Sequence, residues 1–380
     1  MRVVALEEHF TVPALVARID RDAISARGFR PRSAPKSGPN PMELAPEIGE
    51  QRLRSMDEAG ITMQVLSNTG PGPDLVPGPD GIAIAREMND HLAAAVARHP
   101  KRFAGFAVLP MQSPDATAAE LVRAVKELGF LGALINGTTE GRFLDHPSYD
   151  ALLAAAVELD VPIYIHPHLA PEPVRQAYYS ELPAGAARSL EQASWGWHQE
   201  TAIHVLRMVF SGTLDKHPRL KLIIGHMGEM LPVMLRRIDE SSANDVEHLK
   251  RSPSRTILDQ VWITTSGIFS EPPFRRAHYV RHRPHHVLGR LSLRAELDGP
   301  QVPRHDLARA RRHGKAHAQE RGCPAQAQGD IGRTATMKKA LLIVLAIVVC
   351  AVAGAVYLVH SAYRDIVHAF GSGCINGCSR

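Results

Sequence analysis

The feature that most constrains the fold is a regular alternation of short apolar runs with longer stretches of helical composition. The apolar runs have the length of strands, and seven stand out: Val3–Leu6, Met63–Ser67, Phe103–Leu109, Gly132–Ile135, Pro162–His166, Leu222–Gly225 and Val261–Ser266. The Ala-, Leu- and Glu-rich stretches between them include Ala83–Arg98, Ala116–Leu128 and Tyr149–Leu159. Strands that alternate with helices at this spacing predict a parallel α/β fold.

The number of units narrows the prediction further. Seven strand–helix units predict a TIM-like (β/α)8 barrel that lacks only its eighth strand. A doubly wound sheet is the alternative fold, but no Gly-x-Gly-x-x-Gly motif follows the first strand. In a barrel the C-terminal ends of all strands meet at one mouth, and this is where the active sites of such enzymes lie.

The pattern breaks after about residue 280, and the sequence predicts three parts. Residues 1–280, called the body, form the barrel. Residues 281–336 are rich in Arg, His, Gln and Pro, which is typical of disordered segments. In residues 337–380, the run Ala340–Val359 has twenty residues without a charge, which predicts a transmembrane helix. Lys338 and Lys339 favour an N-terminal side of that helix in the cytoplasm.

The excess of basic residues and all the cysteines are confined to the part after residue 280. That part has 15 Lys and Arg against six Asp and Glu, which leaves 29 against 33 in the body. The mildly acidic body argues against specific nucleic-acid binding. All four cysteines follow residue 280, so the body has neither a disulfide framework nor a Cys-based zinc site. The N-terminus has no signal-peptide pattern, and we expect a cytoplasmic body.

Two predicted strands end in residues that could hold a metal ion. Glu7-Glu8-His9 ends the first strand, and alternation along a strand directs Glu7 and His9 to the same side. His166 ends the run VPIYIH, the usual place for a barrel ligand, and His168 ranks second because Pro167 interrupts the strand. Taken singly, each could be an ordinary surface or capping residue, but together they indicate one site.

A third strand end carries a histidine with a nearby carboxylate. His226 follows the run LKLIIG, and Glu229 comes three residues later. A carboxylate that accepts a hydrogen bond from one ring nitrogen fixes the tautomer of the imidazole and raises its basicity. This spacing therefore predicts a pair that handles protons.

Together these motifs resemble the amidohydrolase superfamily, and within it the 2,3-dihydroxybenzoate and γ-resorcylate decarboxylases. The matching stretches are VALEEHF at 4–10, LDVPIYIHPH at 159–168, the segment 199–239 and ITTSGIFS at 263–270. The resemblance implies one divalent metal ion, Zn²⁺ or Mn²⁺, held by Glu7, His9, His166 and an Asp after the eighth strand.

The resemblance also implies roles for other residues and for the assembly. His226 and Glu229 would be catalytic, and Arg237 would bind a small aromatic acid substrate. A polar residue such as Asn is expected near position 242, where this chain has Ser242. A homo-oligomer is expected.

The fourth ligand should lie at about residues 283–292, where the chain instead reads RPHHVLGRLS. Residues 281–294 can be encoded by codons that, read one base later, specify Gly-Ile-Asp-Arg-Ile-Met-Phe-Ser-Val-Asp-Tyr-Arg-Tyr-Glu. That sequence has the character of the missing strand, and its second Asp codon spans those of Arg290 and Leu291. We therefore interpret the part after about residue 281 as frameshifted, and expect the chain as written to be unstable or nearly inactive.

Three functions follow from these patterns. The first is metal-dependent, non-oxidative decarboxylation of a hydroxylated aromatic acid. The second is metal-dependent hydrolysis of an amide or lactone, which needs the same ligands. The third is a non-catalytic remnant tethered to a membrane through residues 340–359.

Overall fold

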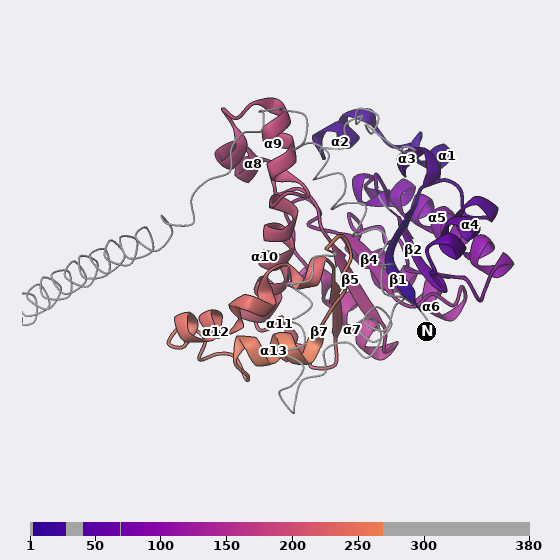
Figure 1. The fold of residues 1–380 in the computed structure, drawn as a ribbon. Helices are drawn as coiled ribbons and strands as arrows, with labels where there is room; N and C mark the ends of the chain where they lie inside the picture. The colour runs from indigo at the N-terminus through magenta and orange to yellow at the C-terminus, as the bar shows by residue number, and fades with distance from the viewer. Residues whose placement is uncertain (1–2, 28–40, 69, 269–380) are drawn as a thin grey trace, which may run out of the picture. The chain divides into compact units, whose positions relative to one another are not determined.

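A computed structural model describes residues 3–27, 41–68 and 70–268 (Figure 1). All of them belong to the first of two compact units, Met1–Pro303. The expected eighth strand, the basic segment 281–336 and residues 337–380 lie outside the described residues.

The described strands form two parallel sheets in chain order. Their bounds are β1 Val4–Phe10, β2 Met63–Asn68, β3 Phe103–Gly105, β4 Ala133–Asn136, β5 Pro162–His166, β6 Lys221–Ile224 and β7 Val261–Ile263. One sheet has the order β1-β2-β3 and the other β4-β5-β6-β7, and a parallel bridge between Ala107 and Ala133 connects the two. The predicted parallel α/β fold is confirmed. The order of these strands lacks the reversal that defines a doubly wound sheet.

Helices connect successive strands. Their bounds are α1 Pro13–Val16, α2 Arg21–Ala26, α3 Pro41–Leu44, α4 Glu50–Glu58, η1 Pro73–Leu75, α5 Gly78–Arg98, α6 Pro114–Lys126, η2 Pro147–Tyr149, α7 Asp150–Glu158, α8 Glu172–Tyr179, α9 Ala184–Glu191, α10 Gly196–Phe210, α11 Thr213–Lys216, η3 His226–Gly228, α12 Leu231–Ser242 and α13 Pro253–Gln260. Local sequence explains several of their starts. Pro114 and Asp115 open α6, where a fixed φ and a negative charge both favour the first turn.

Two apolar clusters lie on opposite faces of the strands. The smaller cluster has one buried side chain from each of five successive strand segments: Val65, Phe106, Leu134, Tyr164 and Ile223. The larger cluster joins the alternate strand residues, such as Ile163, to helix residues such as Leu92 and Leu121. Neighbouring residues of a strand point to opposite faces. The side chains on one face meet in the smaller cluster, so the strands surround a shared interior. The side chains on the other face pack against helices, which cover the outside.

The segments that follow β1 and β5 mark one end of this arrangement. In Figure 1, α2, which comes after β1, lies at the same end as α8 and α9, which come after β5. The carboxyl ends of β1 and β5 therefore open toward the same side, as the barrel prediction requires.

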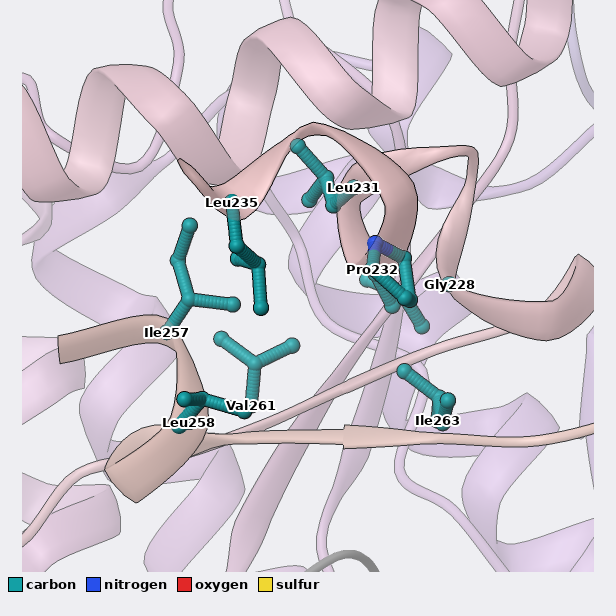
Figure 2. A pocket seen from close by; sticks show the side chains of 9 residues that line it. Gly228, Leu231, Pro232, Leu235, Ile257, Leu258, Val261 and Ile263 are labelled. Carbon is teal, nitrogen blue, oxygen red and sulfur yellow. The ribbon is translucent and has the colours of Figure 1, made fainter. Parts of the chain in front are cut away.

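An apolar pocket lies among α12, α13 and β7 (Figure 2). It is lined by Ile224, Gly228, Leu231, Pro232, Leu235, Ile257, Leu258, Val261 and Ile263. No titratable side chain faces it, so this pocket can accommodate apolar packing but offers no group for catalysis.

The predicted localisation, with a C-terminal segment in the membrane, is wrong as far as the structure describes the chain. Within the described ranges no helix is long and apolar enough to cross a bilayer. The longest of these helices, α5, has 21 residues but carries five charged side chains, including Arg86, Glu87 and Asp90. Residues 340–359, on which the prediction depended, lie outside the described residues.

Candidate metal centre and its histidine pair

The end of β1 supplies two of the predicted ligands. The pairing of β1 with β2 shifts register between Ala5 and Glu8, so β1 is irregular at Leu6 and Glu7, where the predicted ligand pair begins. Bulges in strands re-aim side chains next to active sites. Glu7 and His9 face the interior, whereas Glu8 points elsewhere and accepts a hydrogen bond from Gln64 at 2.9 Å.

The end of β5 brings the third ligand to the same place. The Nε2 atom of His166 lies 3.5 Å from Oε1 of Glu7, and the rings of His9 and His166 meet edge to face at 4.8 Å. One ligand atom from each of Glu7, His9 and His166 lies within 4.8 Å of the other two. One carboxylate and two imidazoles thus converge on a common point, a donor set that suits Zn²⁺ and Mn²⁺.

Burial keeps both histidines of this group neutral. It lowers the pKa of His9 to about 3, and the nearby His166 lowers it in the same direction. Burial likewise lowers the pKa of His166 to about 3, with a further contribution from His226. A metal ligand must be deprotonated, so both rings are ready to bind a cation at neutral pH. The Nδ1 atom of His166 is buried without a hydrogen-bond partner among the described residues.

Several neighbours fix the ligands in place. The hydroxyl of Tyr164 donates a short hydrogen bond to Oε2 of Glu7, and the Nδ1 atom of His9 lies 3.2 Å from the hydroxyl of Ser67. Gly225 is required beside this contact, because a Cβ there would lie 2.5 Å from Oε2 of Glu7 and 3.0 Å from the Tyr164 hydroxyl. Such supporting partners set the orientation of metal ligands.

The loop after β6 carries the predicted pair next to these ligands. The Nδ1 atom of His226 lies 2.7 Å from Oε1 of the buried Glu229, and its Nε2 atom lies 3.6 Å from Oε1 of Glu7. Burial lowers the pKa of His226, but the hydrogen bond to Glu229 and the charge of Glu7 outweigh it and raise the pKa overall. A carboxylate only accepts, so Nδ1 carries the proton and Nε2 faces the ligands.

A second histidine completes this group. The Nδ1 atom of His198, in the first turn of α10, lies 2.5 Å from Oε2 of Glu229. His198, His226 and Glu229 are also close enough to hold an ion. Their separations of 2.5 and 2.7 Å are nevertheless those of hydrogen bonds, whereas ligands bound at about 2.0–2.1 Å in a tetrahedral zinc site lie farther apart.

Three other predicted residues are not part of the ligand group. His168 is buried beside Gly137 and outside the ligand group. Arg237 lies on α12 with an exposed side chain, and Ser242 is buried at the end of that helix. The Asp expected at about 283–292 lies outside the described residues.

Two residues of the site were not singled out from the sequence. Tyr164 had a usable signal, since it precedes His166 by two positions on a strand and therefore points to the same face. His198 had none, because it lies on a helix and meets Glu229 from 31 residues away.

Comparisons with known proteins agree with this geometry. A family of sequences described as amidohydrolase matches residues 9–290 of this chain. The γ-resorcylate decarboxylase of Rhizobium radiobacter is 40% identical over 278 residues, which cover 70% of this chain and 80% of the relative.

Solved structures of decarboxylases also resemble this chain. A dihydroxybenzoic acid decarboxylase from Polaromonas, with bound manganese and the inhibitor 2-nitroresorcinol, matches with a TM-score of 0.64 and 35% identity, covering 73% of this chain and 83% of that one. A 5-carboxyvanillate decarboxylase from Sphingomonas paucimobilis matches with a TM-score of 0.66 and 29% identity, covering 73% and 85%. The described fold, the converging strand-end residues and these matches lead to one conclusion: the chain belongs to the amidohydrolase family, and the relatives described here are decarboxylases.

Proposed function

We propose that the active site of this chain is built for metal-dependent, non-oxidative decarboxylation of a hydroxylated aromatic acid. The observation that carries the proposal is the convergence of Glu7, His9 and His166 beside the pair of His226 and Glu229. Relatives named for γ-resorcylate and dihydroxybenzoic acid support the same substrate class.

The donor set fits one divalent ion. Glu7 supplies an anionic oxygen and the two neutral imidazoles supply nitrogen, so Glu7, His9 and His166 would hold Mn²⁺ or Zn²⁺. Manganese in the Polaromonas relative makes Mn²⁺ the first ion to test. When bound, the ion supplies a Lewis acid and a template for the carboxylate and the ortho hydroxyl of the substrate.

The proton chemistry falls to His226. Glu229 holds the proton on Nδ1, which leaves Nε2 at the mouth 3.6 Å from Glu7. The hydrogen bond to Glu229 raises the pKa of His226, which favours a second proton on Nε2. His226 would deliver that proton to the ring carbon bearing the carboxylate. The bond from that carbon to the carboxylate then breaks, carbon dioxide leaves, and the bonding electrons restore the aromatic ring.

We further propose that the body is a barrel whose last strand and fourth ligand were lost to a shifted reading frame after about residue 281. The comparisons are compatible with such a loss, since the matches cover 70–73% of this chain, leave 15–20% of each relative uncovered, and the family match ends at residue 290. The loss would impair metal binding and turnover. The intact enzyme would be a homo-oligomer, which size-exclusion chromatography with light scattering would test.

The decisive experiment uses the 380-residue chain and a second form whose frame is restored after residue 281. Both are loaded with Mn²⁺ or Zn²⁺ and assayed for carbon dioxide release from 2,6- and 2,3-dihydroxybenzoate. We expect release by the restored form and much less by the chain as written. Hydrolysis of amides or lactones without carbon dioxide release, or no activity in either form, would contradict decarboxylation.

A further inference from the structure

His198 makes two hydrogen bonds, and both partners can only accept. Its Nδ1 atom lies 2.5 Å from the carboxylate of Glu229, and its Nε2 atom lies 3.0 Å from the backbone oxygen of Ala193. An imidazole satisfies two acceptors only when both ring nitrogens carry hydrogen. The geometry therefore points to a positively charged His198, and the hydrogen bond that it donates to Glu229 indeed raises the pKa of His198.

Glu229 lies between two imidazoles that approach from different elements. One carboxylate oxygen accepts from His226 and the other from His198, whose rings lie 5.0 Å apart. The side chain of Glu229 is fully buried, where an uncompensated charge would be costly. A cationic His198 balances that charge from α10, outside the loop that carries Glu229.

That loop has a backbone that needs such support. Five consecutive residues, from His226 to Met230, have positive φ angles, and only Gly228 among them is a glycine. Side-chain-bearing residues in this region are strained and persist only where the surroundings hold them. The backbone N–H of Met227 donates to the oxygen of Thr264 at 2.9 Å, and that of Gly228 donates to the oxygen of Gly225 at 2.8 Å. The hydrogen bonds that Glu229 accepts from His226 and His198 restrain the loop further.

We propose that His198 is a positioning residue that, as an imidazolium, anchors Glu229 and thereby holds His226 with its Nε2 atom facing the metal ligands. His198 acts through Glu229 and needs no contact with substrate. The role deepens the proposed decarboxylase function and rests on it, but the geometry it predicts can be measured without turnover.

The first test is nitrogen-15 NMR of the full chain with labelled histidines at neutral pH. We expect both ring nitrogens of His198 to be protonated and the Nδ1 proton of His226 to exchange slowly. In His198→Ala that proton should exchange roughly tenfold faster or more, because a charge-assisted anchor is gone. In His198→Asn the side-chain amide can still donate to Glu229, so part of the protection should return.

The control is His248→Ala, which removes an exposed histidine that bonds only the backbone oxygen of Phe210 among the contacts described. It should leave the His226 signal unchanged. A bare ring nitrogen on His198, or an unchanged Nδ1 proton of His226 in both His198 variants, would overturn the proposal.

The second test uses turnover by the frame-restored form. His198→Ala should lower kcat by roughly tenfold with little change in KM, and His198→Asn should recover part of the loss. A higher KM with unchanged kcat would assign His198 to substrate binding and refute the positioning role. If the NMR results hold but no form releases carbon dioxide, the proposed function fails while the anchoring geometry stands.

Discussion

Single side chains decide whether the strand ends can hold an ion. The two histidines proposed as ligands stay neutral because burial lowers the pKa of each to about 3. Tyr164 orients Glu7 through its hydroxyl, so the carboxylate presents its other oxygen to the imidazoles. Exchanging any one of these groups should therefore change metal binding more than folding.

Removing His166 should test the ligand set directly. We expect His166→Ala to weaken Mn²⁺ binding by at least the roughly 10–100-fold that loss of a supporting partner alone costs. His168→Asn is the matched control, because His168 lies two residues away but outside the ligand group. Titration calorimetry with Mn²⁺ measures both variants. A larger loss in His168→Asn than in His166→Ala would mean that the ligands are misassigned.

A histidine outside the site should govern part of the acid sensitivity. Burial lowers the pKa of His204 to about 3, and its Nε2 atom accepts the backbone N–H of Leu144 at 3.0 Å. The folded state binds the proton more weakly than the unfolded state. The stabilising contribution is thus complete above about pH 6.5 and declines as the pH falls toward 3.

His204→Gln should remove this contribution because glutamine can accept the same N–H without titrating. Between pH 6.5 and 5 the free energy of unfolding of the unchanged chain should fall by about 2 kcal/mol more than that of the variant. Urea unfolding at several pH values provides the measurement. Parallel pH profiles for the two proteins would rule out a titrating His204.

Elements are joined by buried polar side chains as well as by apolar packing. Asn89 of α5 bonds both the N–H and the oxygen of Val108, at 2.8 and 2.9 Å, and reaches Glu120 of α6 at 2.7 Å. Arg123 neutralises the buried Glu120 within the same helix. This network fixes two helices against the chain that follows β3.

Asn89→Ala should destabilise the fold by about 2–4 kcal/mol, since it leaves buried backbone groups of Val108 without partners. Asp90→Asn is the control, because its exposed ion pair with Arg123 should contribute no more than about 1 kcal/mol. Chemical denaturation compares the two variants. Equal effects would mean that the network is not the source of stability.

At the scale of the whole molecule, the described strands are all parallel and neighbours in the sheets follow the chain. β1 and β7 each have one strand neighbour among the described residues. An eighth strand between them would close the barrel, pair both edges and bring the fourth ligand to the mouth. Restoring the eighth strand is therefore the single change from which we expect the largest effect, because it would close the barrel.

Restoring the reading frame after residue 281 should raise both the melting temperature and the metal content. Closure pairs two exposed edges, and a fourth ligand strengthens a mononuclear site. Calorimetry and metal analysis of the two forms, expressed in parallel, measure these gains. The shifted-frame interpretation would be abandoned if the gene admits no single-base change that restores the strand, or if the restored form binds no more metal.

The sequence alone determined the strand–helix alternation and predicted the residues at the strand ends that converge in the structure. It could do so because strand periodicity is local, and parallel strands bring their carboxyl ends to one mouth wherever they lie in the chain. It gave no indication of the His198 bond to Glu229, and the left-handed turn at His226 was equally hidden. The tertiary structure decided these, as it decided the bond between Tyr164 and Glu7, 157 residues apart, because such contacts depend on how distant elements pack rather than on local pattern.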